Sequence, residues 1–124
     1  MSYANPQAQA DVSRTTPEMQ NAFGVVSQFQ PVVTSVMHGG HVKDSAHYAG
    51  RAIDVGAFGR TPVGRNATTW QALTDAIGSH RFEKIGTIPQ LADDPRLQAW
   101  ARENGVELFV DEGSGPHIHF QVGE

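Results

Sequence analysis

The sequence predicts a single α+β domain in which helices flank a small antiparallel sheet. The chain has 124 residues, enough to bury a core without disulfides, and it contains no cysteine. Apolar residues recur at helical spacing in some segments and alternate with polar residues in others. The connections within residues 32–55 and 106–122 are too short for parallel crossovers, which predicts antiparallel strand pairing.

Composition excludes several classes of function. The absence of cysteine excludes thiol catalysis and a cysteine-built zinc site. A net charge of −4 argues against nucleic acid as a partner. The chain lacks an apolar run of about 18 residues, so no membrane insertion is expected. Residues 1–6 have neither the charged nor the apolar region of a secretory signal peptide, and none is expected.

The N-terminal third is predicted to hold an arm, a helix and a strand. Residues 1–15 are polar and are expected to form a loose arm before a single domain at 16–124. Thr16-Pro17-Glu18 is typical of a helix start, with a capping hydroxyl, a first-turn proline and an acid at the positive end. Pro31 is expected to end this helix. The β-branched segment 32–37 then predicts a strand.

The remaining elements follow from capping residues and periodicity. Polar, glycine-rich residues 38–48 predict a loop. Helices are expected after Asn66 or Thr68 and after Asp94, the latter stopping at Gly105. Further strands are predicted at 51–55, 85–88, 106–110 and 118–122.

Five of the six histidines fall into two groups, His38, His41 and His47, and His117 and His119. In a strand, His117 and His119 point to the same face, as a ligand pair or as a solvated surface pair. Asp54 stands in an apolar strand, where an unpaired carboxylate costs several kcal/mol. Metal ligation explains it, and an ion pair with Arg51 or Arg60 is the alternative. His47, Asp54 and His119 together supply the three ligands of a catalytic zinc site.

These residues resemble the signature of a known group. Ser45-x-His47-x-x-Gly50-x-Ala52-x-Asp54, followed by His117-x-His119, is similar to the motifs of the LAS zinc peptidases. That group includes D-alanyl-D-alanine carboxypeptidases, phage endolysin peptidases of the M15 type and the related Hedgehog fold. The resemblance covers about residues 31–122. It implies a small antiparallel sheet with flanking helices, and one Zn²⁺ per chain held by His47, Asp54 and His119.

The resemblance also implies a general base a few residues before the last ligand. Many members carry Glu three positions before it, where this chain has Pro116. Glu112 is the first candidate, because residues 113–116 are expected to form a loop that allows it to fold back over the metal. His117, as base or oxyanion donor, and Asp111 are the other candidates. Substrate-binding roles are expected for a further set, namely Ser45, Tyr48, Arg51 and His38.

The expected function is therefore a zinc metallopeptidase that hydrolyses peptidoglycan peptides, as a carboxypeptidase or an endopeptidase. The absent signal peptide favours a phage or prophage lysin, either phage-delivered or cytoplasmic until release, or a domain of a larger wall-acting protein. This expectation rests on family analogy. The alternatives are a non-catalytic zinc-binding module of Hedgehog-like fold and a structural phage tail domain. The sequence leaves open the bond that is cut and the oligomeric state.

Overall fold

A mixed β-sheet flanked by helices forms the body of the computed structural model, which describes residues 2–12, 14–35, 50–80, 82–111 and 115–123. The strands lie in the order β1-β2-β3-β7-β5-β6, and β4 pairs with β3. The α+β class is thus confirmed. The strands are β1 (Ser2–Tyr3), β2 (Pro31–Ser35), β3 (Ala52–Phe58), β4 (Thr61–Pro62), β5 (Lys84–Thr87), β6 (Glu107–Val110) and β7 (Ile118–Gln121).

The prediction of a purely antiparallel sheet is wrong at two strand pairs. Strand β3 pairs antiparallel with β2 and β7, and β5 pairs antiparallel with β7. Strands β1 and β2, and β5 and β6, are parallel. The connection from β5 to β6 contains α4 (Pro89–Ala92) and α5 (Pro95–Glu103), and is long enough for the crossover that parallel pairing requires.

Side-chain caps begin the main helices as the sequence indicates. Helix α2 (Pro17–Val26) starts at Thr16, whose hydroxyl accepts from the amide of Met19. Helix α3 (Ala67–Ser79) starts at Asn66, and α5 starts at Asp94. Helix α2 ends at Val26, before Pro31. The 3-10 turn η1 (Ser27–Phe29) follows it, and Pro31 is the first residue of β2.

The N-terminal segment is not the loose arm that its polarity predicts. Strand β1 pairs with β2, and the amide of Ala4 donates to the carbonyl of Val33. Helix α1 (Pro6–Val12) follows, with Asn5 accepting from the amide of Ala8. Ala8 is buried among the core residues. Sheet pairing and this contact order a segment that has few apolar residues of its own.

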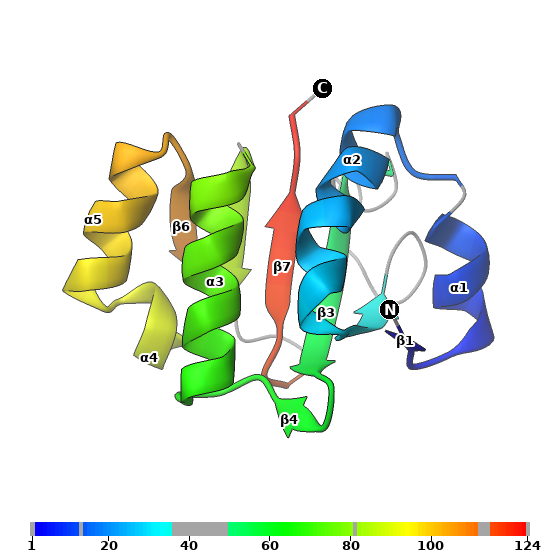
Figure 1. Ribbon diagram of the computed structural model, residues 1–124, viewed down its shortest axis with the longest axis horizontal. Helices are drawn as coiled ribbons and strands as arrows, with labels where there is room; N and C mark the ends of the chain where they lie inside the picture. Colours follow the sequence, from blue (N-terminus) through cyan, green and yellow to red (C-terminus); the bar gives the residue numbers. More distant parts are fainter. Residues whose placement is uncertain (1, 13, 36–49, 81, 112–114, 124) are drawn as a thin grey trace.

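The two faces of the sheet have different characters. Ile53, Phe120, Ile85 and Leu108 are register partners across β3, β7, β5 and β6, and all are buried. They join the core residues of α2 and α3, which lie in front of the sheet in Figure 1. Because side chains alternate, the neighbouring row of residues points to the opposite face. No helix in the described part of the chain is long and apolar enough to span a membrane.

Candidate metal centre

Asp54 and His119, two of the predicted zinc ligands, meet on the face of the sheet opposite the helices. They are direct register partners in the antiparallel pair of β3 and β7. The Nδ1 atom of His119 lies 3.2 Å from Oδ1 of Asp54. The side chains are 9% and 16% exposed. The strand register thus joins two donors that are 65 positions apart in the sequence.

Neighbouring strands enclose the imidazole of His119. Its Nε2 atom lies 2.9 Å from Oε1 of Gln121. The Phe109 ring meets it edge to face, with centroids 5.8 Å apart. Gly86 is the register partner of both His119 and Phe109, and its missing side chain leaves room for the phenyl ring. Burial lowers the pKa of His119, but hydrogen bonds to Asp54 and Gln121 and the charges of Asp54 and Asp111 outweigh it and raise the pKa above its ordinary value.

A second imidazole and carboxylate lie beside this pair. Nδ1 of His117 lies 2.8 Å from the carbonyl oxygen of Gly115. Because a carbonyl oxygen can only accept a hydrogen bond, Nδ1 is the donor. Nε2 of His117 is 3.3 Å from Oδ2 of Asp111. The hydroxyl of Thr87, which is fully buried, donates to the His117 carbonyl at 3.0 Å. This bond attaches the segment before β7 to the end of β5.

The donor atoms at Asp54 and His119 suit a divalent cation. Two ligands of a tetrahedral zinc, each bonded at about 2.0–2.1 Å, lie about 3.3 Å apart. The 3.2 Å separation of Nδ1 and Oδ1 is close to that value. Since Nε2 of His119 already faces an amide oxygen, Nδ1 faces the carboxylate either as a protonated donor or across a shared cation. Nitrogen and oxygen are both ordinary zinc ligands.

Most of the other predicted site residues are not among those that the structure describes. Five of them lie outside the described residues, namely His38, Ser45, His47, Tyr48 and Glu112. Within the described ranges, no group of three or more His, Cys, Asp or Glu side chains is arranged to hold a metal. Arg51 is half-buried, and its Nη1 donates to the Val122 carbonyl at 3.0 Å and lies 3.8 Å from Glu83. Its guanidinium thus pairs with Glu83 rather than with Asp54.

Sequence reasoning missed three neighbours of His119. Gln121 was detectable, because it follows His119 by two positions and therefore shares its face of β7. Gly86 and Phe109 gave no such signal, since they reach His119 only through the strand order β7-β5-β6.

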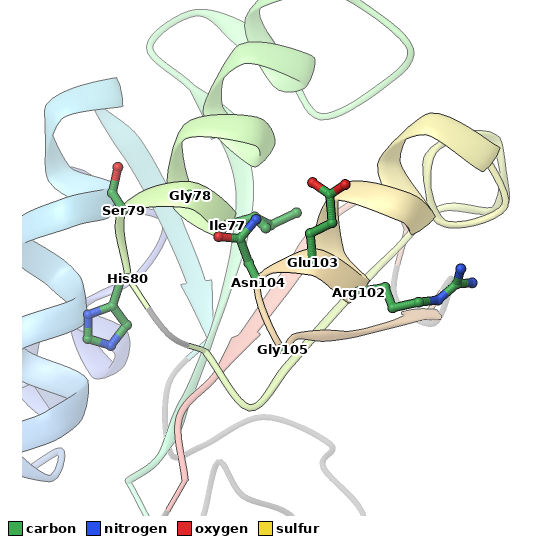
Figure 2. Close-up of a pocket in the computed structure, with 8 residues that line it drawn as sticks. All are labelled: Ile77, Gly78, Ser79, His80, Arg102, Glu103, Asn104 and Gly105. Atoms are coloured by element: carbon green, nitrogen blue, oxygen red, sulfur yellow. The ribbon is translucent and has the colours of Figure 1, made fainter.

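A separate hollow lies between the C-terminal ends of α3 and α5 (Figure 2). Its volume is about 510 Å³, and it is lined by residues 77–80 and 102–105. Figure 2 shows the ring of His80 directed toward α2 and the guanidinium of Arg102 extended away from the hollow. Nε2 of His80 lies 3.1 Å from Oε1 of Glu18. We assign this hollow no catalytic role, because it shares no residue with the Asp54 and His119 cluster.

No protein-family model, curated protein or solved structure matched the chain.

Proposed function

We propose that this chain is a zinc-dependent peptidase that hydrolyses peptidoglycan peptides, with His47, Asp54 and His119 as its metal ligands. One observation supports this most strongly. Asp54 and His119 come from distant parts of the sequence, yet their donor atoms face each other at the separation of two zinc ligands. The substrate class follows from the resemblance of the motifs to the LAS zinc peptidases.

The burial of the pair favours a functional site over a surface ion pair. Exposed histidine–carboxylate pairs contribute little to stability, whereas these two side chains are mostly shielded from water. A carboxylate among buried β-strand residues is destabilising unless it is paired or bound to a cation. The sheet offers an imidazole nitrogen as the partner, which is also a good zinc ligand.

Asp111 and His117 are the described groups suited to proton transfer. Because Nδ1 of His117 donates to Gly115, its Nε2, which lies 3.3 Å from Oδ2 of Asp111, is the ring atom that exchanges a proton. In this role Nε2 takes a proton from the attacking water and returns it to the leaving amine. Zinc, when bound, supplies the Lewis acid that activates water and polarises the scissile carbonyl. Pro116 stands where many LAS members carry glutamate, so this pair is proposed for its task alongside Glu112, which lies outside the described residues.

Metal analysis with matched variants tests the proposal. We expect about one zinc per wild-type chain, as for a structural or catalytic site, and strongly reduced zinc in His47→Ala, Asp54→Asn and His119→Gln. The control is His80→Gln, because this histidine also faces a carboxylate but lies away from the centre. It should retain zinc. Turnover is measured on purified peptidoglycan as released amino groups, with the muropeptide products identified by mass spectrometry.

Each outcome has a distinct meaning. Zinc-dependent cleavage that falls about 100-fold or more in Asp111→Asn supports both the peptidase and the proton-transfer role. A zinc-loaded chain without cleavage contradicts the peptidase and indicates a zinc-binding module. A wild-type chain that binds no zinc refutes the proposal altogether.

A further inference from the structure

A row of hydrogen-bonded side chains leads from His119 away from Asp54. Nε2 of His119 lies 2.9 Å from Oε1 of Gln121, whose Nε2 donates to Oε1 of Glu83 at 2.8 Å. The other carboxylate oxygen of Glu83 lies 3.8 Å from Nη1 of Arg51. We refer to Gln121, Glu83 and Arg51 as the Gln121 row.

The Gln121 row determines which way the amide of Gln121 faces. An ionised carboxylate only accepts hydrogen bonds, so Glu83 requires the amide nitrogen of Gln121. The amide oxygen is thereby directed at Nε2 of His119. Because that oxygen only accepts, the bond requires a proton on Nε2. Oδ1 of Asp54 also only accepts and faces Nδ1, so a cation that binds beside Asp54 would take the place of the proton on Nδ1 and leave the proton on Nε2.

The backbone holds the row in place. The amide of Glu83 donates to the carbonyl of Gln121 at 2.8 Å. Arg51 donates to the Val122 carbonyl at 3.0 Å, and the amide of Val122 donates to the carbonyl of Arg51 at 2.9 Å. Glu83 and Arg51 are therefore both attached to the C-terminal end of β7 or to the residue after it. Reversing the side-chain amide of Gln121 would break its hydrogen bonds to His119 and to Glu83.

We propose that Gln121 is a positioning residue that holds His119 in the Nε2–H tautomer and makes Nδ1 the metal-binding atom. Glu83 acts through Gln121 by fixing the orientation of its amide. Metal-ligating histidines generally donate their second ring nitrogen to such an acceptor, and loss of the acceptor weakens metal binding about 10- to 100-fold. This proposal rests on the proposed zinc site.

Two measurements test the proposal. Long-range ¹H–¹⁵N correlation spectra of the zinc-loaded protein report which ring nitrogen of His119 carries the proton. Competition with a chromophoric chelator reports zinc affinity. The variants are Gln121→Leu, which removes the acceptor, and Glu83→Gln, which leaves Gln121 in place but removes its fixed orientation. The control is Lys84→Met, because Lys84 is the register partner of Gln121 and pairs with Glu107, 3.5 Å away.

We expect the wild type and Lys84→Met to show the Nε2–H tautomer and equal zinc affinity. Gln121→Leu should show mixed tautomers and an affinity about 10- to 100-fold lower, and Glu83→Gln a smaller change in the same direction. If Gln121→Leu does not fold, Glu83→Gln alone decides. An Nδ1–H tautomer in the wild type, or unchanged tautomers in both variants, overturns the proposal. A wild type that binds no zinc refutes the proposed function and this proposal with it, whereas a wild type that binds zinc with the same affinity as both variants refutes the role of Gln121 alone.

Discussion

Replacing Gly86 with alanine tests the packing that supports His119. Gly86 lies between His119 and Phe109 on adjacent strands. A Cβ atom there would lie 2.5 Å from Cζ of Phe109 and 2.9 Å from Cβ of Asp111, well inside van der Waals contact. The phenyl ring must therefore move, and it packs against the imidazole. Such overpacking lowers the free energy of unfolding by about 1–3 kcal/mol.

Thermal unfolding followed by circular dichroism measures this effect. Unfolding entropies of about 2.1 cal/mol/K per residue make 1 kcal/mol equivalent to about 4 °C in Tm for a chain of this length, so a fall of about 4–12 °C is expected. The control is Gly24→Ala in α2, where an added Cβ meets no atom within 4 Å. It should raise stability by about 0.5–1 kcal/mol. A Tm for Gly86→Ala within about 2 °C of the wild type would refute the argument.

A double-mutant cycle identifies the atoms responsible. If the clash with the phenyl ring dominates, Gly86→Ala should destabilise a Phe109→Ala background much less than it destabilises the wild type. The expected coupling is about 1 kcal/mol or more, as for residues in direct contact. Purely additive effects would show that the ring is not the obstacle.

Three further predictions concern the buried hydroxyl, the helix cap and pH. Thr87→Val should lower the free energy of unfolding by about 1–3 kcal/mol in urea titrations, because the His117 carbonyl loses its buried donor, whereas Thr87→Ser keeps the hydroxyl and should lose less. Asn66→Ala should lower the free energy of unfolding by about 1 kcal/mol, because the Asn66 side chain accepts a hydrogen bond from the Thr69 amide at the start of α3. Asn66→Asp keeps an accepting oxygen and should retain most of this stabilisation. In the metal-free protein the raised pKa of His119 means that the protonated ring stabilises the fold. This contribution is complete below the unfolded pKa of about 6.5 and is lost as pH rises through the folded value, so the urea midpoint should fall with pH more in the wild type than in His119→Gln.

Local features of the sequence were sufficient to predict the helix starts. Thr16, Asn66 and Asp94 cap their helices because a short polar side chain binds nearby amides whatever the rest of the chain does. Alternation likewise predicted the strand around His119 and placed His117 and His119 on one side. Asp54 and His119 were predicted as partners because of the resemblance and because an unpaired buried carboxylate is destabilising. The register of β3 and β7 brings the two residues together.

The arrangement of the strands was decided by contacts between distant segments. Strand β5 lies between β7 and β6, and this order alone brings Gly86 and Phe109 to His119. The orientation of Gln121 likewise depends on Glu83, which is 38 positions away in the sequence. Periodicity states which face a side chain occupies, because it reflects the geometry of one strand. It does not state which strands are neighbours, because that depends on the free energy of packing the whole sheet against its helices.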